Sequence, residues 1–181
     1  MKLSWSLVIV LGCLIISAQA GRISGTFDGT STLTPTGTPG IFTQNFSGDG
    51  KDAALGSFTA SSVSTVDFSN PPNIVIKNGM ISLVFSDGEL DGKTSSGTGM
   101  GNGQGMATFT ADFVITGGTG IFANDIGEAK VTGTITTTGP ATEAISASYT
   151  GSLTTVPEPS TVLLLASGFA GFFWWRRSQF R

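Results

Sequence analysis

The sequence predicts an all-β protein, an antiparallel barrel of about eight strands, with a β-sandwich as the alternative. Between residues 21 and 155, apolar residues alternate with small polar ones, and no long stretch follows the spacing of an amphipathic helix. Clusters of Gly, Pro and Asn interrupt this alternation at short intervals. Strongly apolar sequence lies only at the two ends of the chain. The central segment is therefore expected to be one β domain flanked by two non-globular segments.

We expect strands over residues 22–28, 41–46, 55–68, 74–77, 80–86, 106–116, 127–138 and 144–154. In the third, small residues predict a bend or bulge near the middle, and one face carries Phe58, Ala60, Ser62, Ser64, Val66 and Phe68. In the sixth, one face carries Phe109, Ala111, Phe113 and Ile115.

Glycine and asparagine indicate where the connections between strands are expected. The Asn78-Gly79 dipeptide predicts a type I′ hairpin turn. Residues 29–40 are expected to form a loop and residues 47–50 a turn. Residues 87–105 are so rich in glycine that they predict a mobile loop.

Composition narrows the chemistry of the central domain. The chain has no histidine, and its one cysteine, Cys13, precedes the domain. Disulfides, cysteine-based zinc sites and histidine acid–base catalysis are thereby excluded. Acidic side chains outnumber basic ones in residues 21–155, which argues against nucleic acid as a partner. We expect a domain that is not an enzyme and binds no cofactor.

Residues 1–20 predict a signal peptide. Lys2 precedes an apolar stretch over residues 7–16, and Ala18 and Ala20 form the A-x-A pattern that signal peptidase cuts. The mature chain would then begin at Gly21. An alternative is a lipobox around Cys13, which would make that cysteine a lipidated N-terminus.

Residues 156–181 predict a membrane anchor. Residues 162–175 carry no charge, so a helix over them would be about 21 Å long, somewhat short for a bilayer. Trp174 and Trp175 suit the membrane interface, and Arg176 and Arg177 suit retention of the C-terminus on the cytoplasmic side. A single transmembrane helix is expected, preceded by Pro157, Glu158 and Pro159.

This tail resembles the PEP-CTERM sorting signal of Gram-negative bacteria, which is sometimes catalogued as an ice-binding-protein C-terminal domain. The resemblance rests on Pro157-Glu158-Pro159, a short helix with small residues and a terminal arginine cluster. It implies that an exosortase recognises the Pro-Glu-Pro motif and cuts near it. The protein would be held transiently in the inner membrane and then pass to the outer envelope or the extracellular matrix of a biofilm, where exopolysaccharide is a candidate partner. The alternative is an ordinary C-terminal transmembrane helix.

Residues 113–124 and the strand after them resemble a segment of the allene oxide cyclase and dirigent-like barrels. The shared pattern is a strand, Gly117-Gly118-Thr119-Gly120, the aromatic Phe122 and a second strand after Gly127. The resemblance implies the barrel fold and no catalytic residue. It leaves a second function open, in which a lipocalin-like or cyclase-like barrel binds or converts a small apolar ligand.

Two groups of acidic residues are candidates for chemistry. Asp87, Glu89 and Asp91 alternate like the start of a calcium loop, but Thr98 stands where an EF-hand has its bidentate glutamate. We therefore predict no metal site and name these three only as calcium candidates beside an ordinary solvated turn. Asp112 and Glu128 are the other group, a carboxylate pair of the kind that glycosidases use.

Overall fold

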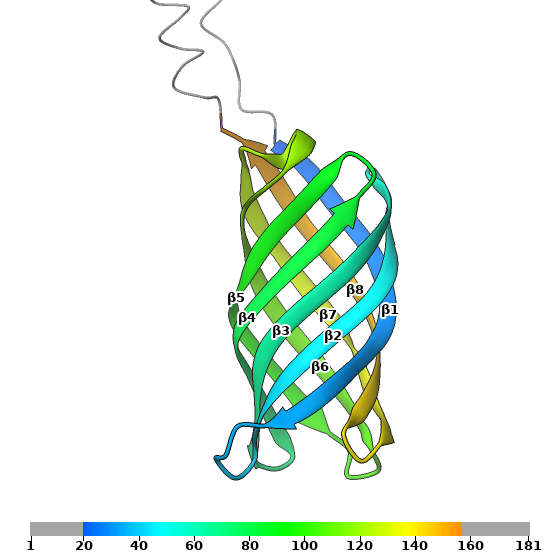
Figure 1. Cartoon of the computed structure of the whole chain (residues 1–181), viewed down its shortest axis with the longest axis vertical. Helices are drawn as coiled ribbons and strands as arrows, with labels where there is room; N and C mark the ends of the chain where they lie inside the picture. Colours follow the sequence, from blue (N-terminus) through cyan, green and yellow to red (C-terminus); the bar gives the residue numbers. More distant parts are fainter. Residues whose placement is uncertain (1–19, 157–181) are drawn as a thin grey trace, which may run out of the picture. The chain divides into compact units, whose positions relative to one another are not determined.

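The structure is a computed structural model that describes residues 20–156, and within them the chain forms a closed antiparallel barrel of eight strands (Figure 1). Each strand pairs with the next, and β8 pairs with β1 to close the barrel. This confirms the predicted barrel over the sandwich. The elements are β1 (Ala20–Pro35), β2 (Ile41–Asp52), β3 (Gly56–Asn70), β4 (Asn73–Phe85), β5 (Gly88–Gly101), β6 (Met106–Gly118), the 3-10 helix η1 (Gly120–Phe122), β7 (Asp125–Gly139) and β8 (Thr142–Thr155).

The barrel has two different ends. At one, which we call the terminal end, the chain enters at β1 and leaves at β8, since Ala20 pairs with Thr154. The other, which we call the mouth, is formed by the β1–β2, β3–β4, β5–β6 and β7–β8 connections and lies at the bottom of Figure 1. Residues 20 and 156, the two ends of the described part of the chain, thus both lie at the terminal end, and the mouth carries only the four connections.

Aromatic side chains fill the terminal half of the interior. Phe85 packs between Phe58 and Phe122, with ring centroids 5.1 and 5.4 Å away. Phe58 also meets the ring of Tyr149 at 6.0 Å. Phe122, only 2% exposed, comes from η1 and packs onto this cluster from the β6–β7 connection. A void lined by Phe27, Leu83 and Tyr149, among others, measures about 30 Å³, which is too small for an organic ligand.

Inward glycines explain why three predicted connections are wrong. The expected loop at residues 87–105 is mostly strand β5, the expected turn at 47–50 lies within β2, and much of the loop at 29–40 belongs to β1. A Cβ on Gly97 would lie 2.7 Å from Cβ of Ile76, and one on Gly50 would lie 2.6 Å from Cε2 of Phe58. These glycines leave space for large side chains at the paired positions of the neighbouring strands, a role that glycine has in tightly coiled sheets.

The predicted hairpin at Asn78-Gly79 is also wrong. Both residues lie inside β4, where the pairing with β3 slips between Val63 and Thr65. Asn78 has a positive φ of 52°, so the dipeptide forms an irregularity within the strand pair in place of a turn. The chain actually reverses at residues 71–72 and again at 86–87.

Other local predictions are confirmed. The slip opposite β4 is the expected irregularity near the middle of β3. The expected faces of β3 and β6 also point inward, with Phe58, Ala60, Val66, Ala111 and Ile115 all buried. Within residues 20–156 we find no helix with the length and apolar character needed to cross a bilayer, and the predicted C-terminal transmembrane helix lies outside those residues.

Candidate functional site

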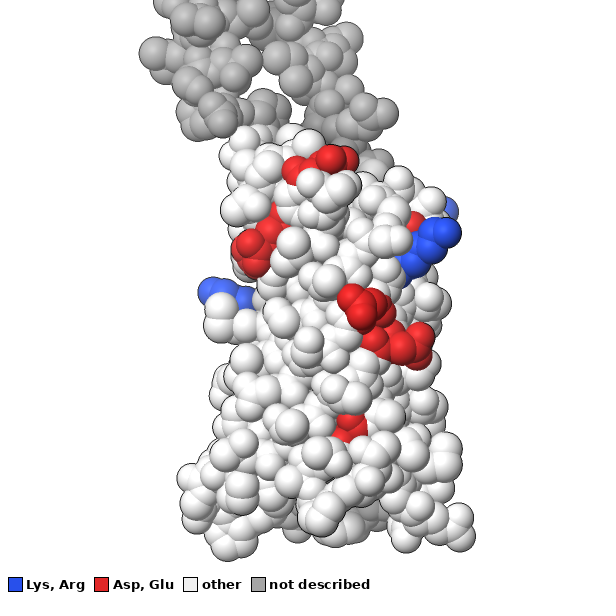
Figure 2. Space-filling model, turned by 45° about the vertical axis from the view of Figure 1, so that its right-hand side comes forward, with Lys and Arg blue, Asp and Glu red and all other residues white. Residues whose placement is uncertain are grey.

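The rim of the mouth carries no charged residue. Its four connections, at residues 36–40, 71–72, 102–105 and 140–141, contain only Gly, Pro, Thr, Asn, Gln and Ala. Figure 2 shows the same sparsity on one face, where the lowest part of the barrel is free of red and blue side chains. In the 102–105 connection, Asn102 Oδ1 accepts hydrogen bonds from the backbone N–H groups of Gln104 and Met106 at 2.8 and 3.1 Å. An uncharged rim makes the entrance suitable for an apolar molecule.

A pocket of about 270 Å³ opens at this end. Strands β3 to β8 and the glycine-rich β5–β6 connection all contribute to its wall, so the pocket is the open lower part of the barrel interior. Its size is close to the lower limit for pockets that hold organic ligands. The apolar part of its wall consists of Phe68, Pro71, Pro72, Ile74, Met106, Ala107 and Ile135.

Glu143 is the one charged residue in this wall, whose other polar side chains are Asn73 and Thr137. Glu143 stands near the start of β8 and is 5% exposed. Its Oε2 accepts hydrogen bonds from Ser31 Oγ at 2.9 Å and Gln44 Nε2 at 2.7 Å. Ser64 Oγ in turn donates to Oε1 of Gln44 at 3.4 Å. Strands β1, β2, β3 and β8 therefore share one buried polar network, of which Glu143 also lines the pocket.

The second oxygen of Glu143 differs from the first. Oε1 accepts no hydrogen bond from residues 20–156, whereas every fully buried side-chain nitrogen or oxygen in that part of the chain has a partner. Oε1 must therefore keep some contact with solvent. Glu143 is also one of the residues that form the wall of the pocket. The network thus donates hydrogen bonds to Oε2 of Glu143 and none to Oε1.

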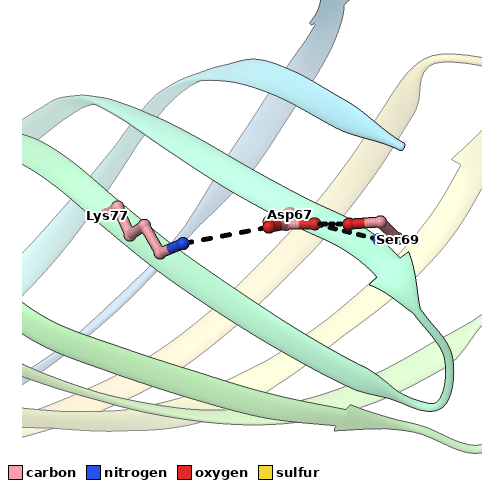
Figure 3. A network of polar contacts seen from close by, with 3 residues as sticks. All are labelled: Asp67, Ser69 and Lys77. Carbon is pink, nitrogen blue, oxygen red and sulfur yellow. Dashed lines mark hydrogen bonds and ion pairs between the residues drawn. The ribbon is translucent and has the colours of Figure 1, made fainter. Parts of the chain in front are cut away.

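A network of polar contacts among Asp67, Ser69 and Lys77 lies near the end of β3, the strand that contributes Phe68 to the wall of the pocket (Figure 3). The backbone N–H of Ser69 donates to Asp67 Oδ1 at 3.0 Å, the Ser69 hydroxyl donates to the same oxygen, and Lys77 Nζ lies 3.9 Å from Oδ2. These contacts, led by the Ser69 hydroxyl, lower the pKa of Asp67. Phe68, which lies between Asp67 and Ser69 in the sequence, lines the pocket. Its ring packs edge-on against that of Phe42, with the ring centroids 5.8 Å apart.

A second buried carboxylate, Asp52, lies at the terminal end and is fully bonded. It is 1% exposed and accepts hydrogen bonds from the backbone N–H groups of Ser24, Ala54 and Leu55 and from the Tyr149 hydroxyl, at 2.6 to 3.0 Å. Its donors come from β1, β8 and the β2–β3 turn, so Asp52 joins the two strands that close the barrel. Neither oxygen is available to a ligand, and we assign Asp52 a structural role.

Because of Tyr149, we expect the free energy of unfolding to decrease at alkaline pH. Burial, and then its hydrogen bond to Asp52, raise the pKa of the Tyr149 phenol above its ordinary value. Its stabilising contribution is thus complete below about pH 10, the pKa of an unfolded tyrosine, and is lost as the pH rises beyond that value, by up to about 1.4 kcal/mol per pH unit. Tyr149 is the one tyrosine in the chain, so tyrosinate absorbance reports on it alone.

We expect native protein to show no tyrosinate signal until it unfolds. The stability advantage of wild type over Tyr149→Phe should be about 1–2 kcal/mol at neutral pH and shrink above pH 10. Tyrosinate formation near pH 10 in a protein that is still folded would contradict this account.

The predicted acidic site residues do not converge. Asp87 is in the β4–β5 turn, while Glu89 accepts a hydrogen bond from the Ser82 hydroxyl. Burial, and then the nearby Glu89 carboxylate, raise the pKa of Asp91. In the described part of the chain, no group of three or more acidic, histidine or cysteine side chains is arranged to hold a metal ion.

Asp112 and Glu128 lie on neighbouring strands and line a shallow depression outside the pocket. Asp112 stands opposite Lys130 in the register and accepts a hydrogen bond from Ser96 Oγ at 3.0 Å. Most of the predicted targeting residues fall outside residues 20–156. These are Ala18, Pro157, Glu158, Pro159, Arg176 and Arg177, while Ala20 is the first residue of β1.

Comparison with known proteins identifies the tail. Residues 155–177 match the model of the PEP-CTERM protein-sorting motif. No curated protein and no solved structure matches the chain. The resemblance to the allene oxide cyclase barrels therefore gains no support, although the barrel itself is present.

The protein thus combines a closed eight-stranded antiparallel β-barrel with a C-terminal sorting sequence. That sequence is a PEP-CTERM sorting motif, and the motif implies export, processing by an exosortase and transient anchoring at the membrane before release.

Proposed function

We propose that this protein is a non-enzymatic component of the outer envelope or exopolysaccharide matrix, delivered as a folded barrel after exosortase cuts its tail. The observation that carries the proposal is the position of the sorting motif. The matched segment begins at Thr155, the last residue of β8, and Pro157 follows two residues later. Prolines fix an extended backbone that cannot continue the sheet ladder, which suits recognition by a protease. A cut at or beyond Pro157 would leave all eight strands intact.

The terminal end of the barrel is consistent with processing at both ends of the chain. Signal peptidase cutting after Ala20 would remove only the first residue of β1. Asp52 then binds Ser24 in β1 and Tyr149 in β8, close to the places where the chain enters and leaves the barrel. Closure of the barrel therefore does not depend on either removed segment. The absence of histidine, and the scattered acidic groups of residues 20–156, support a non-enzymatic role.

Substitution of the motif tests the proposal in a bacterium that carries an exosortase. We expect the triple variant Pro157→Ala, Glu158→Ala, Pro159→Ala to remain full-length in the membrane fraction, while wild type appears in a shorter form outside the inner membrane. The double variant Ser160→Ala, Thr161→Ala is the matched control, because it changes neighbouring residues without altering Pro-Glu-Pro, and it should be processed normally. Immunoblots of membrane and surface fractions give the readout.

Two results would refute the proposed sorting. One is normal processing of the triple variant. The other is normal processing of wild type in a strain whose exosortase gene has been deleted, which would assign the cut to a different protease.

A further inference from the structure

We propose that the mouth of the barrel is a binding site for a small amphipathic amine, with its hydrocarbon part in the apolar pocket and its ammonium group on Oε1 of Glu143. Such a ligand differs from the neutral apolar molecule that a fold resemblance alone would suggest. The inference rests on the mouth pocket and does not depend on how the protein is sorted.

Glu143 has no compensating positive charge among the residues of the pocket or its rim. A buried carboxylate is costly unless a cation or several strong hydrogen bonds compensate it. Glu143 receives two hydrogen bonds, both from neutral groups and both on Oε2. Neither the residues that line the pocket nor the rim connections include a Lys or Arg. The positive charge missing from the site is one that a protonated amine can provide.

Asp52 and Glu143 differ in how their oxygens are hydrogen-bonded. Both carboxylates are almost completely buried inside the same barrel. Asp52 uses both oxygens and accepts four hydrogen bonds, as expected of a structural group. Glu143 accepts hydrogen bonds on one oxygen only, and the residue lines a pocket of about 270 Å³. A group that served only to stabilise the fold would have no need of this cavity.

The wall of the pocket defines the rest of the ligand. Ile74, Ile135 and Phe68 offer aliphatic and aromatic surface. The pocket is smaller than most sites for drug-sized molecules, so the apolar part should be about the size of one hydrocarbon ring. The uncharged rim adds no second point of attachment for a charged group.

Three ring compounds of equal size test the proposal on the full-length protein. They are cyclohexylmethylamine, cyclohexylmethanol and cyclohexanecarboxylate, titrated at pH 7 while the methyl resonances of Ile74 and Ile135 are followed by NMR, with free concentrations measured by dialysis. We expect the amine to bind at least about tenfold more tightly than the alcohol, because a charge-assisted hydrogen bond replaces a neutral one. The carboxylate should leave both methyl signals unmoved.

The variant Glu143→Gln keeps the acceptor for Ser31 and Gln44 but removes the charge. It should abolish the preference for the amine while leaving the affinity for the alcohol within about twofold. Ala107→Leu is a second variant, which fills the pocket and should abolish binding of both compounds. The proposal is overturned if amine and alcohol bind wild type equally, if Glu143→Gln keeps the preference, or if Ala107→Leu binds as wild type does.

Discussion

Replacement of Asp52 by alanine is expected to lower the free energy of unfolding by about 3–5 kcal/mol, enough to leave much of a marginally stable barrel unfolded. The carboxylate accepts three backbone hydrogen bonds and that of the Tyr149 hydroxyl in a site that is 1% exposed. Removing it leaves four donors without their acceptor, and a buried unsatisfied donor costs about 1–3 kcal/mol. Urea unfolding followed by far-UV circular dichroism measures the loss.

Asp49→Ala is the matched control for this experiment. Asp49 lies on the same strand but points outward, is exposed, and faces Asp28 across the β1–β2 pair. Because like charges directly opposite each other are destabilising, its removal should be neutral or slightly stabilising. Equal losses in the two variants would show that the hydrogen bonds of Asp52 do not support the barrel.

Replacement of Gly50 by alanine is expected to cost about 2–3 kcal/mol, since overpacking forces backbone and side chains to shift. The added Cβ would lie 2.6 Å from Cε2 of Phe58 and 2.6 Å from the backbone oxygen of Thr26. Gly21→Ala is the control, because a Cβ there meets nothing within 4 Å, and its effect should stay within about 0.5 kcal/mol.

A double-mutant cycle with Phe58→Leu separates the ring clash from the backbone clash. A smaller side chain at position 58 should reduce the cost of Gly50→Ala by at least about 0.5 kcal/mol. Strict additivity of the two substitutions would show that the glycine does not serve to accommodate the Phe58 ring.

Alternation of apolar and small residues predicted the architecture because a closed barrel places every second residue inside, as β3 and β6 illustrate. The same principle fails at glycine. Gly97 has no side chain to mark a face, so β5 looked like a loop, and only the presence of Ile76 on the neighbouring strand explains the residue. The turn predicted at Asn78-Gly79 is wrong for a related reason: a positive φ, which this dipeptide adopts readily, occurs in bulges within strands as well as in turns.

The sequence predicted a ligand pocket only through the alternative function of a ligand-binding barrel, and it identified no residue of that pocket. Glu143 continues the inward series of Ile145, Ala147 and Tyr149, so a last strand that began one residue earlier than the predicted 144–154 would place a carboxylate inside the barrel. Ser31 and Gln44 gave no such signal, since polar residues are common on exposed faces and these two meet Glu143 only once the barrel closes. The sorting motif was recognisable because its residues are contiguous.

Mass spectrometry of both ends of the mature protein, isolated from the cell surface, is the most direct test of the account as a whole. The account predicts a chain that begins at Gly21 and ends near Pro157-Glu158-Pro159, with all eight strands retained. A surface form that still ends at Arg181 would contradict it.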